Sequence, residues 1–320
     1  MPTDATDPQA IAAAVAALKA GELIGLPTET VYGLAGDARN PTALARIFAL
    51  KGRPSEHPLI VHIGAVAELA DWARELPDSA HALAQAFWPG PLTLILKRHA
   101  AVSDLVTGGQ DTVGIRMPSH PVALAVLRAF GGALAAPSAN RFGHISPTTA
   151  RHVRDEFGNA LGLVLDGGAT AVGIESTIID LCSHPPRILR PGAISRAQIE
   201  AVIGPVREGS QQDSPRVSGA LAAHYAPRTA TELLPREAIT ARVKALAQAG
   251  QRPLVLAIGS LPVGCKGLAL PEQAPAFARR LYAALRQLDA SQADRLLIES
   301  PPDGTDWTAV RDRLQRASAG

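Results

Sequence analysis

Short apolar runs recur over the first 181 residues of the chain, and they constrain its fold more than any other feature. Seven runs are found, at 22–27, 58–63, 92–97, 113–117, 133–137, 161–166 and 176–181. Apolar runs of this length, without alternating polar residues, are typical of strands buried on both faces of a sheet. Helical patterns lie between them, so the sequence predicts an α/β or α+β fold with a large twisted mixed sheet and flanking helices.

Capping residues indicate where these helices begin and end. Asp7 followed by Pro8 predicts the start of a helix that ends at Gly21, and Asn40 followed by Pro41 predicts a second start. We expect a third helix to begin at Ser119 and end at Gly131–Gly132, and a fourth to begin at Pro147 and end near Gly158.

A change in composition divides the chain. Residues 206–222 lose hydrophobic periodicity and are rich in Gly, Ser, Gln and Pro, which is typical of a linker. We therefore expect a first domain over 1–205 and a linker over 206–228. Beyond it, predicted strands at 229–234, 253–258 and 295–299 alternate with helices at 236–249, 272–288 and 305–317. This order predicts a small open-sheet, Rossmann-like α/β domain over 229–320.

Composition and charge exclude several classes of protein. A net charge of +2 is too small for a protein whose main task is to hold nucleic-acid backbones, so any RNA contact should be local. Cys182 and Cys265 lie far apart, which disfavours a structural zinc site or a disulfide framework. The sequence has no apolar run of about 18 residues and no signal-like N-terminus. We therefore expect a cytoplasmic protein without a membrane span.

Polar loops follow the predicted strands. The segment PTETVYGLAG (27–36) offers Thr28, Thr30 and Tyr32 in a turn, a composition suited to a small polar ligand. An ordinary turn, with threonines bonded to local backbone, explains the same residues.

The segment KGRPSEHPLIVHI (51–63) brings together two cations and two imidazoles. Lys51 and Arg53 lie in a loop where both can reach one polyphosphate, which predicts a site for ATP. A solvated basic loop, with His62 as a core histidine, is the alternative. His57 and His62 are five residues apart and alternate between faces of a strand, so we expect no shared metal ion.

Arg116 lies inside the apolar strand of VGIRMPSHP (113–121). A buried arginine needs an anion or a dense set of acceptors, because its charge cannot be removed. A substrate carboxylate would serve, and so would an internal salt bridge to Asp or Glu.

Two more loops offer hydroxyl and amide groups. APSANRFGHISPT (136–148) contains Ser138, Asn140 and Ser146, which can line a nucleotide site, although N-capping alone explains Ser146. GGATAVGIESTIIDL (167–181) adds Ser176 at the entry of a strand. Neither loop matches a phosphate-binding fingerprint. GSLPVGCK (259–266) fails as a P-loop because Cys265 interrupts its Gly-Lys pair.

Two segments complete the set. RILRPG (187–192) places Arg190 at the end of a strand, and HYAP (224–227) follows the linker with an imidazole beside a phenol. A linker that carries this pair can fold back as a lid, or Tyr225 can anchor the linker to a domain surface.

As an ordered set, these segments resemble the threonylcarbamoyl-AMP synthase family, in the long form with a YrdC-like N-terminal domain and an added C-terminal domain. The matching motifs are PTETVYGL, KGRP with HPL, PGPLT, VGIRMPSHP, PSAN with SPT, GIESTIID and ILRPG, followed by HYAP and DRLQRA (312–317). Each motif is short, but so many in one order are specific. The chain departs from the family pattern at Arg141–Phe142 and at Arg216–Val217.

The resemblance implies roles for individual residues. L-Threonine would be bound by Thr30, His62, Arg116 and Ser176, with Arg116 opposite its carboxylate. ATP would be bound by Lys51, Arg53, His57, Ser138, Asn140, Ser146, Arg190 and Tyr225. Lys51, Arg53 and Arg190 are the expected catalytic residues, because phosphoryl-type transfers gain most from cations placed around the developing charge.

The implied reaction joins L-threonine, bicarbonate and ATP into threonylcarbamoyl-AMP, with release of pyrophosphate and water. It is the first step in forming threonylcarbamoyladenosine in tRNA, so the resemblance implies the downstream tRNA threonylcarbamoyl-transferase machinery as a partner, with only a weak tRNA contact. Mg²⁺ is expected to accompany ATP, held by phosphate oxygens and water rather than by a metal site of the protein.

Three other functions are open to a chain with these motifs. The first is a non-catalytic module that binds tRNA or double-stranded RNA through phosphates. The second is a carbamoyl-phosphate-dependent transferase, for which the chain has too few residues and cysteines. The third is a separate ligand or regulatory role for the C-terminal domain, where no strong motif supports it.

Overall fold

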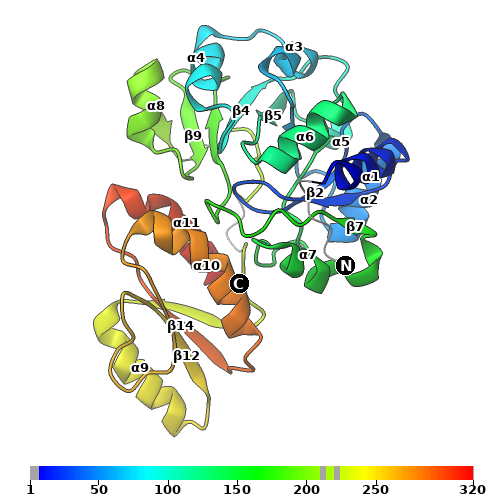
Figure 1. Ribbon diagram of the computed structural model, residues 1–320. Coiled ribbons are helices and arrows are strands. Elements are labelled where there is room, and N and C mark those ends of the chain that lie inside the picture. Colours follow the sequence, from blue (N-terminus) through cyan, green and yellow to red (C-terminus); the bar gives the residue numbers. More distant parts are fainter. Residues whose placement is uncertain (1–6, 210–213, 220–223, 320) are drawn as a thin grey trace. The chain divides into compact units, whose positions relative to one another are not determined.

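The computed structural model describes residues 7–209, 214–219 and 224–319, and the chain divides into two compact units (Figure 1). Within the described residues, the first unit contains 7–142, 147–171 and 175–219. The second unit contains 143–146, 172–174 and 224–319. Two short loops of the N-terminal part of the chain therefore pack with the C-terminal unit.

The described residues of the first unit form a mixed ten-stranded sheet in the order β10-β9-β8-β4-β5-β3-β6-β2-β1-β7. Its strands are β1 (Ile24–Leu26), β2 (Gly33–Asp37), β3 (Ile60–His62), β4 (Leu92–Lys97), β5 (Thr112–Arg116), β6 (Leu134–Ala135), β7 (Leu163–Val164), β8 (Thr177–Asp180), β9 (Arg187–Arg190) and β10 (Arg207–Glu208). β3 runs parallel to β5, and β4 runs parallel to β8 but antiparallel to β5. The predicted large mixed sheet is confirmed, and each of the seven apolar runs contains one of its strands.

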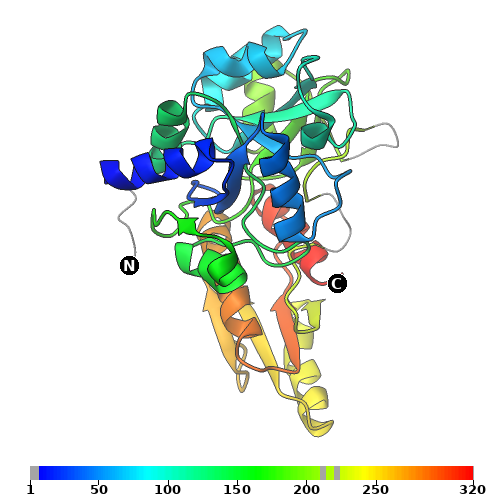
Figure 2. The ribbon, with the colours of Figure 1, turned by 90° about the vertical axis from the view of Figure 1, so that its right-hand side faces the viewer.

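Helices pack on both faces of this sheet. α1 (Pro8–Lys19) and α6 (Pro121–Phe130) lie side by side on one face, over β6, β2 and β1 (Figures 1 and 2). The other face is covered by α2 (Pro41–Lys51), α3 (Leu69–Trp72), α4 (Asp78–Phe87), α5 (Asp104–Thr107), α7 (Ala150–Phe157) and α8 (Arg196–Ile203). On the face of α1 and α6, no described helix of this unit packs over β3, β5, β4, β8 and β9.

Local chemistry explains the helix starts and corrects two of them. Asp7 and Asn40 cap α1 and α2, as predicted. Ser119 does not cap α6; His120 does, because Pro121 takes the first helical position and the cap is the residue before it. Pro147 does not begin α7, because its carbonyl accepts the N–H of Tyr32 and the chain stays extended until Thr149 caps the helix.

The second unit is a small open α/β sheet, as predicted. Its described strands are all parallel in the order β11-β14-β12-β13, with β11 (Thr231–Leu234), β12 (Pro253–Ile258), β13 (Gly267–Leu270) and β14 (Arg295–Glu299). α9 (Arg236–Gln248) packs on one face, and α10 (Ala274–Asp289) and α11 (Thr308–Ala317) also contact the sheet. β13 escaped prediction because it begins at Gly267, where a side chain would collide with the carbonyl of Val255.

Replacing Ile115 with alanine should lower the free energy of unfolding by about 2–5 kcal/mol, because Ile115 is fully buried in β5 and its loss leaves a cavity. Urea denaturation measures the change. Val66, which is 40% exposed in the same unit, provides the control: Val66→Ala should change stability by no more than about 0.5 kcal/mol. Equal effects of the two substitutions would contradict the assigned core.

Candidate active site

One face of the large sheet collects polar side chains on its helix-free part. His62 of β3 pairs in register with Arg116 of β5, and Ile178 of β8 pairs both with Thr93 of β4 and with Arg190 of β9. Residues paired across strands share a face, and the register of β4 against β5 places Thr93 on the face of Arg116. Four polar side chains therefore project from one side of the neighbouring strands β9-β8-β4-β5-β3. They are His62, Thr93, Arg116 and Arg190.

Arg116 is the centre of the first cluster, and loops distant in sequence hold its guanidinium. Nη2 donates to Oε1 of Glu29 at 2.5 Å, Nη1 to Oγ1 of Thr30 at 2.9 Å, and Nε to the carbonyl of Gly90 at 3.3 Å. The hydroxyl of Thr28 lies 2.9 Å from that of Thr30. The internal salt bridge that the sequence left open is therefore present, between side chains only 5% and 9% exposed.

Electrostatics define the charge states in this cluster. Burial opposes the ionisation of Glu29, but the charge and the hydrogen bond of Arg116 outweigh it and hold the pKa of the carboxyl below its usual range. Burial, together with the charge of Arg116, lowers the pKa of His62 to about 3. The imidazole of His62 is therefore neutral near pH 7, with Nδ1 3.2 Å from the carbonyl of Ile60, in agreement with a core histidine.

Ser176 links Arg190 to Thr93, which lies beside Arg116 in the register of β4 against β5. Nε and Nη2 of Arg190 donate to the carbonyl of Ser176 at 3.1 and 2.9 Å, and Nη2 also donates to its hydroxyl at 3.1 Å. That hydroxyl lies 2.7 Å from the hydroxyl of Thr93. Gly192 allows this approach, because a Cβ there would lie 2.3 Å from the backbone nitrogen of Thr177.

A second cluster forms where α2 ends. Gly52 adopts the left-handed conformation at φ 61°, which stops the helix and leaves Lys51 in its last turn and Arg53 just beyond it. Nζ of Lys51 donates to the backbone carbonyls of Ser138 and Asn140. The predicted nucleotide residues of the two loops thus lie together, although Ser138 and Asn140 contact Lys51 through backbone rather than side-chain atoms.

The positive charge of Arg53 influences the pKa of its neighbours in this second cluster. Burial and the charge of Arg53 lower the pKa of Lys51 well below its usual range, and the same two causes lower the pKa of His57. The ring of Phe142 lies 5.2 Å from that of His57 and 5.7 Å from the guanidinium of Arg53. Phe142, where the chain departs from the family pattern, therefore packs against two predicted ATP-binding side chains.

Ser218 joins the two clusters. Its hydroxyl accepts a hydrogen bond from Nη2 of Arg53 at 3.0 Å and donates to the carbonyl of Pro58 at 3.1 Å. Its carbonyl accepts from Nη1 of Arg190 at 2.8 Å. Two cations that the sequence assigned to ATP therefore meet at one residue.

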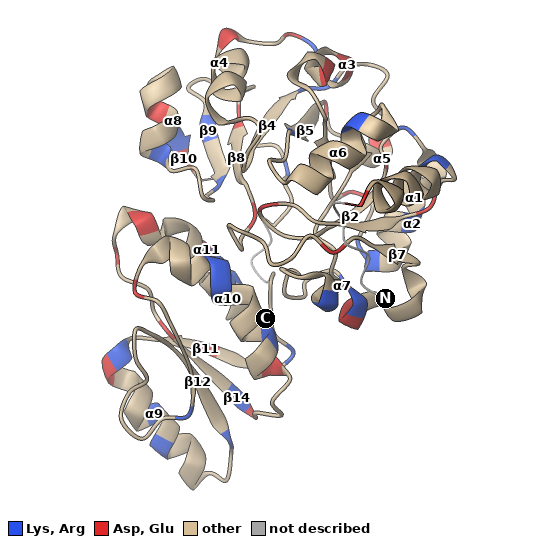
Figure 3. Ribbon diagram, in the orientation of Figure 1, with Lys and Arg blue, Asp and Glu red and all other residues tan. Residues whose placement is uncertain are grey.

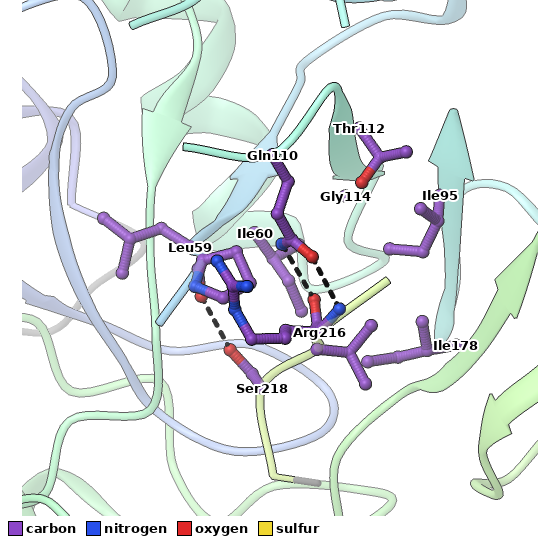
Figure 4. Close-up of a pocket in the computed structure, with 11 residues that line it drawn as sticks. Leu59, Ile60, Ile95, Gln110, Thr112, Gly114, Ile178, Arg216 and Ser218 are labelled. Carbon is purple, nitrogen blue, oxygen red and sulfur yellow. Dashed lines mark hydrogen bonds between the residues drawn. The ribbon is translucent and has the colours of Figure 1, made fainter. Parts of the chain in front are cut away.

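The chain before Ser218 is fixed to the sheet by both polar and apolar contacts (Figure 4). The side-chain amide of Gln110 accepts from the N–H of Arg216 at 2.6 Å and donates to its carbonyl at 3.1 Å. Val217 is buried in a cluster with Ile95, Ile178 and Leu189. The segment 216–218 thus covers part of the helix-free face. Residues 210–213 and 220–223 of the predicted linker lie outside the described residues.

Ser146 and Tyr225 belong to the second unit. Ser146 is fully buried. The ring of Tyr225 stacks on Tyr282 at 5.7 Å and lies 5.4 Å from the guanidinium of Arg313, which pairs with Asp312 at 2.6 Å. These contacts agree with the anchoring interpretation of Tyr225, and its role at the nucleotide stays a prediction, as does that of Ser146.

Sequence reasoning missed three residues of this site. Glu29 lies within a motif that the sequence singled out, and the need for a partner to Arg116 indicated an acid without naming it. Gln110 and Ser218 carry no local signal, because their partners Arg216 and Arg53 are 106 and 165 residues away in sequence. Val217 is the only aliphatic side chain between Arg207 and Ser218, and it is the one local signal from which docking of this segment could have been predicted.

No group of three or more His, Cys, Asp or Glu side chains suited to a metal ion occurs among the described residues. Within that same part of the chain, no helix has the length and apolar character that a bilayer span requires. Lys and Arg are interspersed with Asp and Glu along both units (Figure 3).

Comparison with known proteins identifies the family. A family model described as "Telomere recombination" matches residues 16–192, and one described as "Threonylcarbamoyl-AMP synthase, C-terminal domain" matches residues 194–319. The threonylcarbamoyl-AMP synthase of Bacillus subtilis is 41% identical, over 98% of this chain and 94% of its own length. That of Pyrococcus abyssi is 39% identical, over 94% and 92%. The chain belongs to the threonylcarbamoyl-AMP synthase family.

A solved structure supports the same assignment. P. abyssi Sua5 complexed with L-threonine matches with a TM-score of 0.91 and 38% identity, over 96% of this chain and 94% of that one. The family resemblance and the fold class predicted from the sequence are both confirmed.

Replacing His62 with glutamine should make stability less dependent on pH. The imidazole has a pKa of about 3 in the folded protein and 6.5 when unperturbed, so only the unfolded chain takes up a proton as pH falls below 6.5. Between pH 7 and pH 5, the wild-type protein should therefore lose about 2 kcal/mol more stability than His62→Gln. Urea denaturation at both pH values measures it. His81→Gln, at an exposed position in α4, is the control, and identical pH slopes for all three proteins would contradict a buried neutral His62.

Replacing Gln110 with alanine should expose the peptide bond after Arg216 to trypsin. The substitution removes both hydrogen bonds that hold the backbone of Arg216, so the local opening that a protease needs becomes more frequent. Limited proteolysis followed by mass spectrometry measures the cleavage rate, which should rise by about tenfold for a loss of about 1.4 kcal/mol. Gln248→Ala, in α9, is the matched control, and unchanged cleavage in Gln110→Ala would show that Gln110 does not hold the segment.

Proposed function

We propose that the first unit joins L-threonine, bicarbonate and ATP to give threonylcarbamoyl-AMP, pyrophosphate and water. The family and the relatives named threonylcarbamoyl-AMP synthase support the reaction. The observation that carries the proposal to this chain is the position of Arg190 between the two clusters. Arg190 contacts Ser176, whose hydroxyl reaches Thr93 beside Arg116 in the sheet, and it shares Ser218 with Arg53. An amino-acid site and a polyphosphate site on one sheet face are what the reaction requires.

The cluster around Arg116 is the proposed threonine site. Arg116 would receive the carboxylate of threonine, with Thr30, His62 and Ser176 around the rest of the molecule. A guanidinium has five N–H donors, of which Arg116 uses three on Glu29, Thr30 and Gly90. Two donors remain for a substrate carboxylate, so the salt bridge to Glu29 and the proposed role are compatible.

The cluster around Arg53 is the proposed site of the triphosphate. Lys51, Arg53, His57 and Arg190 would contact phosphate oxygens, together with Ser138 and Asn140 from the neighbouring loop. Ser146 and Tyr225 would complete the nucleotide site, a role that rests on the family resemblance. A phosphate beside Lys51 would raise its lowered pKa, because a nearby opposite charge favours the protonated amine.

The chemistry then needs no nucleophile from the protein. Bicarbonate gives CO2 and hydroxide, and the neutral amine of threonine captures the CO2 while its released proton combines with the hydroxide as water. An oxygen of the resulting N-carboxylate then attacks the α-phosphorus of ATP and expels pyrophosphate. Lys51, Arg53 and Arg190 would hold the reactants in line and neutralise the developing charge. Mg²⁺ that accompanies ATP would be held by phosphate oxygens and water.

The segment 216–218 takes part in this proposal as a cover. Ser218 occupies N–H donors of Arg53 and Arg190 that a triphosphate would use, so ATP would have to displace or share them. Such a cover would also shield the labile product from water. The product would pass to the tRNA threonylcarbamoyl-transferase machinery in the cytoplasm, with at most a weak tRNA contact by this chain.

Mass spectrometry of a reaction containing the purified protein, ATP, Mg²⁺, L-threonine and bicarbonate tests the function. Threonylcarbamoyl-AMP and pyrophosphate should appear together, and omission of any one substrate should abolish both. A protein that binds RNA without producing either compound would instead be the non-catalytic module.

Arg53→Ala and Arg190→Ala should each lower kcat/KM for ATP by about 100-fold or more, because each removes a cation from the proposed phosphate site. Pyrophosphate release measures activity, and circular dichroism checks that the fold is retained. Arg151→Ala is the control, since the side chain of Arg151 is 87% exposed on α7. Turnover equal to that of the control would remove the residue concerned from the site.

A further inference from the structure

Glu29 is a buried acid whose carboxylate is only half used. The residue is 7% exposed, and Oε1 accepts the hydrogen bond from Arg116. Oε2 is shielded from water and has no hydrogen-bond partner among the described residues. The backbone N–H groups of Glu29 and Ser119 help to lower the pKa of the carboxyl, but neither makes a hydrogen bond to Oε2.

An unpaired oxygen in this position lowers the stability of the folded protein. Arg116 keeps the pKa of the Glu29 carboxyl below its usual range, so the group carries a full negative charge near pH 7. An unpaired buried acceptor costs roughly 1–3 kcal/mol, and more when it is charged. Such groups are rare in native proteins, and each calls for a functional explanation.

The side chains that face Glu29 leave Oε2 without a cationic partner. Arg116 is bound to Oε1. His62 and His120 both lie within reach of the charge of Glu29, but burial lowers the pKa of each. His62 lies near the cluster as a neutral imidazole, with Nδ1 at the carbonyl of Ile60. No side chain among the described residues donates to Oε2, so this position can accept a donor group of a bound ligand.

We propose that Oε2 of Glu29 binds the amino group of the amino-acid substrate, so that Arg116 and Glu29 together receive both charges of its zwitterion. This assignment rests on the proposed function and adds a residue to its threonine site. The carboxylate and the ammonium of an α-amino acid are separated by one carbon atom. Arg116 and Glu29, 2.5 Å apart, present the complementary charges side by side. Two free donors on Arg116 and one free acceptor on Glu29 match that ligand.

Glu29 acts here by binding and orientation rather than by removing a proton. The contacts that keep its carboxylate ionised also make it a weak base, which suits an ion pair and not proton abstraction. Its site has a low local dielectric, so an ion pair there is stronger than one in water. The pair holds the nitrogen atom in position, and this nitrogen captures CO2 after the ammonium has released one proton to solvent. The pair also selects amino acids over hydroxy acids.

Calorimetric titration of the wild-type protein and Glu29→Gln with two ligands tests the proposal. One ligand is L-threonine, and the other is 2,3-dihydroxybutyrate, in which a hydroxyl replaces the amine. Glu29→Gln should bind L-threonine about tenfold or more weakly, because the ion pair is lost. Binding of the hydroxy acid, which has no ammonium, should change by no more than about twofold.

Equal weakening of both ligands would overturn the proposal, because Glu29 would then act only by holding Arg116. Unchanged binding of L-threonine would overturn it as well. Glu22→Gln is the matched control for loss of a carboxylate, since Glu22 forms an exposed ion pair with Arg46, and it should bind both ligands like the wild type.

A second variant covers a failure of Glu29→Gln to fold. Glu29→Asp keeps the charge but withdraws the carboxylate by one methylene, so it should weaken L-threonine more than the hydroxy acid, and equal effects would again overturn the proposal. Failure of the wild-type protein to bind L-threonine or to release pyrophosphate would instead overturn the proposed function, and this assignment with it.

Discussion

The buried guanidinium groups of Arg116 and Arg190 are the constraint on which the rest of the site depends. A guanidinium keeps its charge at any pH that the fold survives, so each must find acceptors where its strand carries it. Here the acceptors come from loops: the carboxylate of Glu29 for Arg116, and the carbonyls of Ser176 and Ser218 for Arg190. Segments without regular structure are thereby fixed against one face of the sheet. The contacts of the two guanidinium groups therefore order the loops of the site, and the same groups are the ones proposed to bind the substrates.

The described helices of this unit cover only part of that face, and the site lies on the part without them. α1 and α6 bury the face over β6, β2 and β1, so the neighbouring strands keep a face without a described helix of this unit, and the segment 216–218 covers part of it. Two successive residues of this segment make different kinds of contact. Val217 buries an apolar side chain against the sheet, and Ser218 presents a hydroxyl and a carbonyl to the arginines. A short segment that docks through one apolar side chain and a few hydrogen bonds can be displaced at a cost far below that of opening the core.

The sequence predicted those parts of the fold that depend on local pattern. All seven apolar runs contain strands, since burial on both faces leaves a pattern that does not depend on the partner strand. β2 was missed because GLAGD is rich in glycine and ends in an acid, both weak strand formers, and only pairing with β1 and β6 makes it a strand. For the site, motif order located the cations, but contacts such as Ser218 with Arg53 depend on how distant segments dock. The predicted start of α7 was wrong for the same reason, because the carbonyl of Pro147 accepts a hydrogen bond from the backbone N–H of the distant Tyr32.

Repulsion among the cations is a second constraint on the site. Burial and the charge of Arg53 lower the pKa of both Lys51 and His57, while Glu156 and Glu56 act in the opposite direction, so the positive charge of Arg53 opposes further positive charge in this cluster. Lys51 is held by neutral carbonyl groups, and carbonyl dipoles offset its charge only in part. A triphosphate would relieve this repulsion and favour protonation of Lys51 at the same time, so nucleotide binding and proton uptake are thermodynamically linked. The ring of Phe142 under Arg53 strengthens this effect, because an apolar neighbour excludes the water that would otherwise screen the charges.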